Sequence, residues 1–370
     1  MSNPTRDQDR AVETPVPPQG VGRAGRANAV PAATSPQVSL SWHTDHLLGA
    51  PFQEAPLGLA TLVRYPHPDS SPSPRGAVLH VHGYNDYFFQ EHLARSFAAA
   101  GYAFHAVDLR AAGRSLRPGQ IPHFVTDLRE QAGDVAAAAR AVRRLEPGLP
   151  LVVHAHSTGG LTAALWAHAH RNAAGADAGP DALVLDSPFL DLSAPGWQRT
   201  FGTRLLDSLG HLASTSVVSD NLSRYAEHLL AANGGRWEFD TTLKRPEGQP
   251  ARVGWFVAVR RGQARVAAGL EIACPVLLAR SDSSGPDELD NPLLDAQDTI
   301  LDVEQMAALG PRLGDDVTEL VIPGGVHDLS LSARGPREAY LDGMLSWTNR
   351  RVSAQGADDT AHGTTDTYKI

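Results

Sequence analysis

The 370-residue chain has only one cysteine, Cys274, so it can form neither an internal disulfide nor a cysteine-rich metal site. No stretch approaches the roughly 20 apolar residues that a membrane-spanning helix needs. The N-terminus also lacks the basic and then apolar segments of a secretory signal. We therefore expect a cytoplasmic protein with no transmembrane segment.

Positive charge is likewise scarce and scattered. Lysine and arginine number 32 against 41 acidic residues, which gives a formal net charge of −9, and no cluster of basic residues stands out. A nucleic-acid-binding protein needs a basic patch to bind phosphates. The composition therefore excludes that class of partner, and a small-molecule substrate is expected instead. Oligomeric state is not encoded in any pattern of the chain.

Strand-like and helical segments alternate through the central part of the chain, which we assign to one domain over residues 37–352. Helical patterns begin at Leu128 and at Val303, and an earlier extended pair is expected at 38–42 and 60–65. The apolar runs of strand length are 76–83, 102–108, 150–156, 182–187, 275–281 and 318–324. Such alternation predicts a mostly parallel sheet with helices on both faces.

Three segments depart from this alternation. Residues 1–36 are rich in Pro, Gly, Ala, Arg and Thr without any period, and 353–370 have a similar character, so both are predicted to be disordered. The connection over about 191–269 is far longer than the usual few residues between elements. We interpret it as a cap over the ends of the strands, and a helical embellishment with no role at the site is the alternative.

A strand meets a helix at "AHSTGG", and Ser157 stands at the junction. A nucleophilic serine needs a sharp, strained strand-to-helix turn and small neighbours, a requirement usually met by the pattern G-x-S-x-G. Gly159 and Gly160 meet that need, while Ala155 replaces the first glycine and adds one methyl group. The pattern alone is weak, but its position favours Ser157 as a nucleophile.

A serine nucleophile also needs a histidine base and an acid that orients the base. His327, in a glycine-rich loop after the last strand, is the candidate base. Asp298, shortly before a predicted helix, is the candidate acid. Other aspartates stay open as alternatives for that acid: Asp282, Asp302, which is suited to a helix N-cap, and Asp186.

Two backbone N–H groups must stabilise the negative charge that develops during the attack. Thr158, directly after the serine, supplies one candidate. Tyr84, in "VHGYNDY", supplies the other, since Gly83 permits an unusual backbone there and His82 is expected to brace the loop. Candidate substrate contacts are Asn85, His156, Trp237 and Trp255.

With these residues assembled, the chain resembles the α/β-hydrolase superfamily, in the branch of monoacylglycerol lipases, lysophospholipases and the serine aminopeptidase-like hydrolases. The segments that carry the resemblance are "HVHGYNDY", "AVDLRAAGRS", "AHSTGG", "LDSPFLDL" and "GGVHD". The resemblance implies an α/β-hydrolase fold with about eight strands, a helical cap after the sixth strand, and hydrolysis of carboxylic esters with neither metal nor cofactor.

These observations lead to one hypothesis and two alternatives. The hypothesis is a serine hydrolase that cleaves acyl esters, either monoacylglycerol-like, lysophospholipid-like or small, through an acyl-enzyme. An aminopeptidase or amidase of the same fold would need an acidic group in the cap, for which Glu238 and Asp240 are candidates. A binding protein that kept the fold and lost the chemistry is the second alternative.

Overall fold

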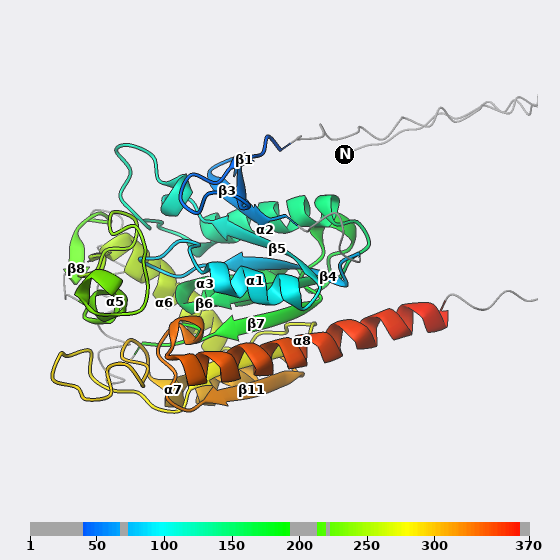
Figure 1. Cartoon of the computed structure of the whole chain (residues 1–370). Coiled ribbons are helices and arrows are strands. Elements are labelled where there is room, and N and C mark those ends of the chain that lie inside the picture. The colour runs from blue at the N-terminus through cyan, green and yellow to red at the C-terminus, as the bar shows by residue number, and fades with distance from the viewer. Residues whose placement is uncertain (1–39, 67–72, 193–212, 220–222, 363–370) are drawn as a thin grey trace, which may run out of the picture. The chain divides into compact units, whose positions relative to one another are not determined.

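A computed structural model of the protein describes residues 40–66, 73–192, 213–219 and 223–362, with side chains up to Ser353 (Figure 1). All of them belong to one compact unit that begins at Leu40. The predicted N-terminal arm, residues 1–36, lies outside the described residues.

A nine-stranded sheet forms the centre of the unit, in the order β1-β2-β3-β5-β4-β6-β7-β10-β11. The first three strands join the sheet antiparallel, and all pairings from β5 to β11 are parallel. The strands are β1 His43–Thr44, β2 Gln53–Leu57, β3 Ala60–Tyr65, β4 Gly76–Val81, β5 Tyr102–Asp108, β6 Leu151–His156, β7 Ala182–Asp186, β10 Val276–Ser281 and β11 Val317–Ile322. The prediction of a mostly parallel α/β-hydrolase sheet is confirmed.

The antiparallel edge differs from the expectation in its details. β3 matches the predicted segment 60–65, but it pairs with β2 and β5. Of the predicted segment 38–42, residues 40–42 form no strand, and 38 and 39 lie outside the described residues. Only Ala55 of β2 is buried. The apolar period on which the sequence prediction depends is therefore missing there, and pairing with β3 is what makes that segment a strand.

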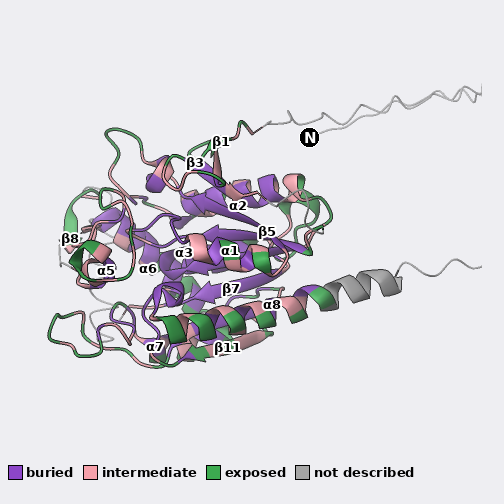
Figure 2. Ribbon diagram, in the orientation of Figure 1, coloured by how far each residue is buried: buried purple, intermediate pink, exposed green. Residues whose placement is uncertain are grey.

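Helices cover both faces of the sheet (Figure 1). α2, α3 and α6 pack on one face in a core with Leu79 and Val153, and α1 and α8 pack on the other with Val78 and Val152. Consecutive strand residues thus enter opposite cores, and Figure 2 shows the central strands buried along their length. The helices are α1 Glu91–Ala99, α2 Leu128–Leu145, α3 Ser157–Ala169, α5 Tyr225–Leu229, α6 Val253–Ala267, α7 Val303–Leu309 and α8 Arg334–His362.

The long connection between β7 and β10 contains α5, α6 and a small sheet of two strands, β8 Val217–Ser219 and β9 Ala251–Arg252. α6 packs against α3 in the core, and β8, α5 and β9 lie beyond the carboxyl ends of the strands (Figure 1). The part of the predicted cap at 193–212 and 220–222 lies outside the described residues.

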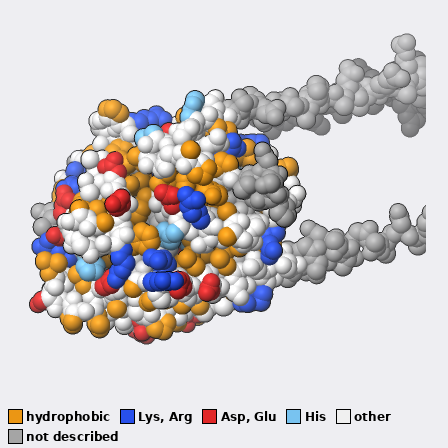
Figure 3. All heavy atoms as spheres, in the orientation of Figure 1, with side chains coloured by type: hydrophobic (Ala, Val, Ile, Leu, Met, Phe, Trp, Pro, Cys, Tyr) orange, Lys and Arg blue, Asp and Glu red, His pale blue; other side chains and the backbone are white. Residues whose placement is uncertain are grey.

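The C-terminal helix α8 continues past Ser353, where the irregular tail was expected to begin, to His362. In the parts of the chain that the structure describes, no helix combines the length and apolar character needed to cross a membrane. On the face shown in Figure 3, acidic and basic side chains are interspersed among hydrophobic ones.

Candidate active site

The serine turn, where β6 ends at His156 and α3 begins at Ser157, has no residue between strand and helix. Ser157 therefore adopts a left-handed backbone with φ of 53°. Such a conformation is costly for a residue with a Cβ atom and is retained where the surrounding structure imposes it. The strained turn that the sequence predicts for a nucleophile is present, and Ala155, fully buried in β6, fits the site that a glycine usually occupies.

Close packing around this turn explains the small residues. A Cβ atom at Gly159 would collide with the carbonyl oxygen of His82, and one at Gly160 would lie 2.9 Å from Cβ of Pro188. On the opposite side, a Cβ atom at Gly83 would lie 3.0 Å from Cβ of Ser157. The first turn of α3 is thus wedged against the loop that follows β4.

Replacing Gly159 with alanine is expected to destabilise the protein by about 3 kcal/mol, because the colliding oxygen belongs to backbone that cannot rotate away. Gly133→Ala is the matched control: Gly133 lies in α2, is exposed, and a Cβ atom there would meet nothing within 4 Å. That change is expected to stabilise the protein by about 0.5–1 kcal/mol. Urea denaturation of both variants measures the two effects, and equal midpoints would contradict the packing argument.

A hydrogen-bonded chain joins the predicted nucleophile, base and acid. Nε2 of His327 lies 3.0 Å from Oγ of Ser157, and Nδ1 lies 2.9 Å from Oδ2 of Asp298. A carboxylate can only accept, so Nδ1 carries the hydrogen and donates it to Asp298, and Nε2 accepts from the serine hydroxyl. This is the tautomer that a general base next to a serine requires.

Asp298 is fully buried and its position is set by its own loop. The backbone N–H groups of Ile300 and Leu301 donate to its Oδ1 at 2.9 and 2.8 Å, which leaves Oδ2 for the histidine. A short bridge between Ser284 and Asp298 folds the long loop back on itself. The carboxylate of Asp298 is therefore held in place even though the loop that carries it is long.

The alternative acids lie elsewhere. The exposed Asp282 accepts a hydrogen bond from the N–H of Gly324, and Asp302 is the N-cap of α7. Asp186 is buried at the end of β7 and accepts a hydrogen bond from the N–H of Leu329. Burial and the nearby charge of Asp328 raise the pKa of Asp186 to about 8, so it is neutral at pH 7.

The loop after β4, residues 82–90, is called the oxyanion loop below. His82 braces it as expected: its Nε2 accepts from the N–H of Leu109 at 3.0 Å, so its Nδ1–H donates to the carbonyl oxygen of Gly83 at 2.8 Å. Thr158 lies in the first turn of α3, where N–H groups have no partner within the helix. Tyr84 and Thr158 both line the cavity above Ser157. The predicted oxyanion pair is thus next to the nucleophile.

The oxyanion loop is also fastened to the cap. The hydroxyl of Tyr84 donates to the carbonyl oxygen of Pro250, and the centroids of the Tyr84 and Trp255 rings lie 4.1 Å apart. The amide of Asn85 forms two hydrogen bonds with the backbone of Arg245, each 2.9 Å long. Asn85 therefore holds the cap, in addition to any contact with a substrate.

A cavity of about 490 Å³ lies over the serine between the sheet and the cap. Its apolar lining includes Phe189, Leu192, Trp255, Ile300 and Leu301, and its polar lining includes Asn85, His156, Ser219, Ser223, Lys244 and Gln249. Among the described residues that line the cavity, none is an aspartate or a glutamate.

Of the four predicted substrate contacts, Trp237 is the one that the structure does not bring to this cavity. Its ring packs against that of His92 at 4.5 Å, and its Nε1–H donates to the carbonyl oxygen of Leu331. The aromatic residues of the insertion thus divide between the cavity, where Trp255 lies, and the packing of the cap itself.

Sequence reasoning missed Asp86, Asp328, Lys244 and Tyr225. The hydroxyl of Tyr225 accepts a hydrogen bond from the N–H of Asp328 at 2.8 Å, and its ring packs edge-on against His327. For Asp86 and Asp328 the only signal in the sequence is proximity: Asp328 directly follows the predicted base, and Asp86 lies two residues after Tyr84.

A parallel sheet of this order, with a serine, histidine and aspartate at the carboxyl ends of its strands, defines an α/β-hydrolase. Residues 72–283, more than half of the chain, match the family described as serine aminopeptidase, S33. The chain belongs to this family and is a hydrolase of the α/β-hydrolase type, as the motifs predict. The matched segment contains Ser157 but ends before Asp298 and His327.

Solved structures of this fold are similar to the chain at low identity. A monoacylglycerol lipase from Paleococcus ferrophilus is 20% identical, with a TM-score of 0.55 over 76% of this chain and 96% of that one. A soluble variant of the monoglyceride lipase of Saccharomyces cerevisiae is 15% identical, with a TM-score of 0.59 over 86% and 97%. A carboxyl esterase from Bacillus coagulans is 15% identical, with a TM-score of 0.54 over 85% and 100%. No curated protein sequence matches the chain significantly.

Proposed function

We propose that the protein is a serine hydrolase that cleaves carboxylic acyl esters through an acyl-enzyme. The single observation that carries the proposal is the hydrogen-bonded chain from Ser157 through His327 to Asp298 at the floor of a cavity. Ester hydrolysis by this fold needs that arrangement and two nearby N–H donors. The similar structures, two lipases and a carboxyl esterase, support the same chemistry.

Each member of the site has one role in the proposed reaction. Oγ of Ser157 attacks the ester carbonyl while His327 takes its proton and then gives it to the leaving alcohol. Asp298 keeps the proton on Nδ1 of the imidazole and stabilises the imidazolium that forms. The N–H groups of Tyr84 and Thr158 stabilise the tetrahedral oxyanion, and water then releases the acid by the reverse sequence.

The lining of the cavity favours an ester with an apolar acyl chain over a peptide with a free amino terminus. An amine would require a carboxylate partner, and none lines the cavity among the described residues. Of the two candidates in the cap, Glu238 is exposed, and Asp240 accepts hydrogen bonds from Thr242. A monoacylglycerol-like, lysophospholipid-like or small ester suits the apolar wall better.

Hydrolysis of p-nitrophenyl esters of graded acyl length, beside an amino-terminal proline amide, tests this proposal. We expect turnover of the esters only, with kcat/KM rising about fourfold for each added methylene until the apolar wall is filled. The Ser157→Ala variant is the control for serine dependence. Cleavage of the amide alone would identify a peptidase. A folded wild type that neither turns over nor reacts with a fluorophosphonate would indicate a binding protein.

A further inference from the structure

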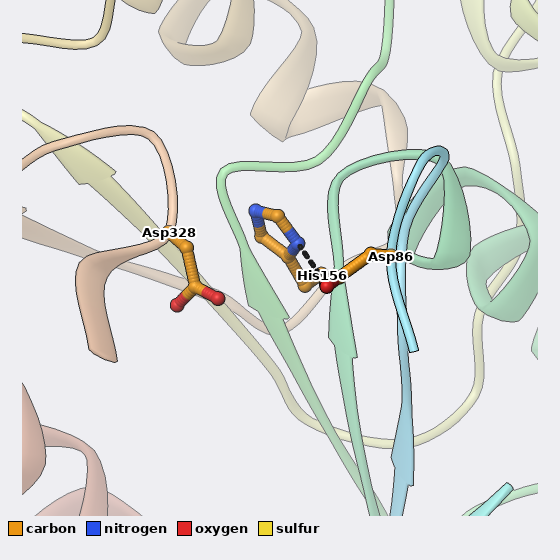
Figure 4. Close-up of side chains that lie close together, drawn as sticks. All are labelled: Asp86, His156 and Asp328. Carbon is orange, nitrogen blue, oxygen red and sulfur yellow. Dashed lines mark ion pairs between the residues drawn. The ribbon is translucent and has the colours of Figure 1, made fainter. Parts of the chain in front are cut away.

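A second cluster of ionisable side chains lies beneath the catalytic residues. It consists of Asp86, His156 and Asp328, whose candidate ligand atoms all lie within 4.8 Å of one another. The three side chains are nearly inaccessible, with exposed fractions of 1%, 4% and 2%. Figure 4 shows the ring of His156 between the two carboxylates. The reaction proposed above uses none of them.

The members of this cluster are chain neighbours of the catalytic residues. His156 directly precedes Ser157, and Asp328 directly follows His327. Asp86 belongs to the oxyanion loop, two residues after Tyr84. The cluster therefore connects the serine turn, the oxyanion loop and the loop of residues 323–328, called the histidine loop below. His156 also lines the cavity, whereas Asp86 and Asp328 do not.

The surroundings of His156 favour its charged form. Among the described residues, neither of its ring nitrogens has a hydrogen-bond partner, and the nearest carboxylate oxygen, Oδ2 of Asp86, is 3.8 Å from Nδ1. An imidazolium in this position is attracted by both carboxylates, whereas a neutral ring has no such attraction. Burial opposes the charge, but the carboxylates of Asp328, Asp86 and Asp186 outweigh it and raise the pKa of His156 to about 9.

A divalent cation would also suit two carboxylates and an imidazole. Two sets of contacts nevertheless favour the imidazolium of His156 as the cation of this cluster. Nζ of Lys244 lies 3.0 Å from Oδ1 of Asp86 and already balances that carboxylate. Asp328 accepts hydrogen bonds from Ser330 on one oxygen and from Gln90 on the other. A metal would in addition require His156 to be neutral.

We propose that His156 is a positioning residue, a buried imidazolium that holds the oxyanion loop and the histidine loop against the serine turn. The inference rests on the proposed function, since these three segments carry the oxyanion donors, the base and the nucleophile. Loss of the charge leaves two carboxylates facing each other across a neutral ring. The loops then separate, and the N–H of Tyr84 and the ring of His327 move relative to Ser157.

This arrangement predicts an alkaline limit to activity. His156 carries its charge below pH 9 and loses it as the pH rises through about 9. Asp186, whose pKa is raised to about 8, ionises at lower pH and adds a negative charge that retains the proton on His156. Besides Asp86, Asp328 and Asp186, charged or titratable groups from several elements act on His156 or its two partners. Among the described residues they are Lys244, His80, His82, His92, His123, His154, His327, Tyr87, Tyr225 and Tyr340.

The test compares kcat against pH for the wild type, Asp328→Asn, His156→Gln and the control Asp302→Asn. Asn is isosteric with Asp, so Asp328→Asn removes the charge and keeps the size of the side chain. It is expected to lower kcat about tenfold at neutral pH and to move the alkaline limit down by about one pH unit, with KM nearly unchanged. His156→Gln is expected to lose the limit altogether. Asp302→Asn keeps an N-cap residue and should match the wild type.

Carbon-13 labelling of the histidine Cε1 atoms provides a measurement on the wild type that does not depend on catalysis. The resonance absent from His156→Gln identifies His156, which should be charged at neutral pH and titrate near pH 9, and at lower pH in Asp328→Asn. A neutral His156 at pH 7, or an unmoved midpoint in Asp328→Asn, overturns the inference. So does a shift of that resonance with a rise in activity on adding Zn²⁺ or Mn²⁺, which would make the cluster a metal site.

Failure of the proposed function would appear differently. In that case the wild type would neither hydrolyse esters nor react with a fluorophosphonate, while the titration of His156 would still decide whether the charged ring is present.

Discussion

Replacing Ser157 with alanine is expected to lower kcat for ester hydrolysis by about 10⁵- to 10⁶-fold while the protein stays folded. The hydroxyl is the group that His327 contacts through Nε2, and the methyl group of alanine cannot attack a carbonyl. Turnover of a p-nitrophenyl ester measures the loss, and thermal unfolding checks the fold. Activity close to that of the wild type would assign the chemistry to another nucleophile.

Glycine at the same position provides a matched comparison. Ser157 has a φ of 53°, which costs energy for serine and alanine alike but little for glycine. Ser157→Gly should therefore be as inactive as Ser157→Ala and more stable by about 1 kcal/mol. Equal stability of the two variants would indicate that the serine turn stores no strain.

The Asp298→Asn variant is expected to lower kcat by about 10⁴-fold. The N–H groups of Ile300 and Leu301 need an acceptor at Oδ1, so the amide nitrogen of asparagine must take the place of Oδ2. It would then donate to Nδ1 of His327 and force the hydrogen onto Nε2. A ring in that tautomer cannot accept the proton of Ser157. Steady-state kinetics with a short-chain ester measures the effect.

The other candidate acids serve as controls for this variant. Asp282→Asn and Asp302→Asn alter a loop contact and a helix cap, and neither side chain contacts His327. Asp186→Asn imitates the neutral carboxyl group that its raised pKa already favours at pH 7. All three are expected to keep activity within a few-fold of the wild type. If one of them loses activity and Asp298→Asn does not, Asp298 is not the acid.

Features that depend on neighbouring residues could be predicted from the sequence. All six strands of the parallel part are visible in the sequence. Five of them are apolar because they are buried along almost their whole length, whereas β11, at the edge of the sheet, is mostly exposed or half-buried. Ser157 stands out since a strand, a sharp turn and a helix of small residues are all local patterns. His327 could be placed as well, because the glycine-rich loop that carries it directly follows the last strand.

The acid and the cap could be predicted only in part. Several aspartates lie between β10 and α7, and nothing in their spacing distinguishes the one that faces His327. Asp298 does so because the loop pairs with itself at Ser284, a contact that depends on the whole fold. Likewise, the composition of the insertion does not reveal that Trp255 lines the cavity while Trp237 packs on α1.

The sequence by itself determined the α/β-hydrolase class, the serine turn and the histidine that meets it, because periodicity and turn geometry are properties of adjacent residues. Only the tertiary structure decided which aspartate accepts the hydrogen bond from His327. It also decided that Asp86, His156 and Asp328 form a buried cluster. In sequence each of these three is an isolated polar residue. The segments that follow β4, β6 and β11 bring the three residues together at the carboxyl ends of the strands. Because they are buried there side by side, the charge of each depends on the charges of the other two.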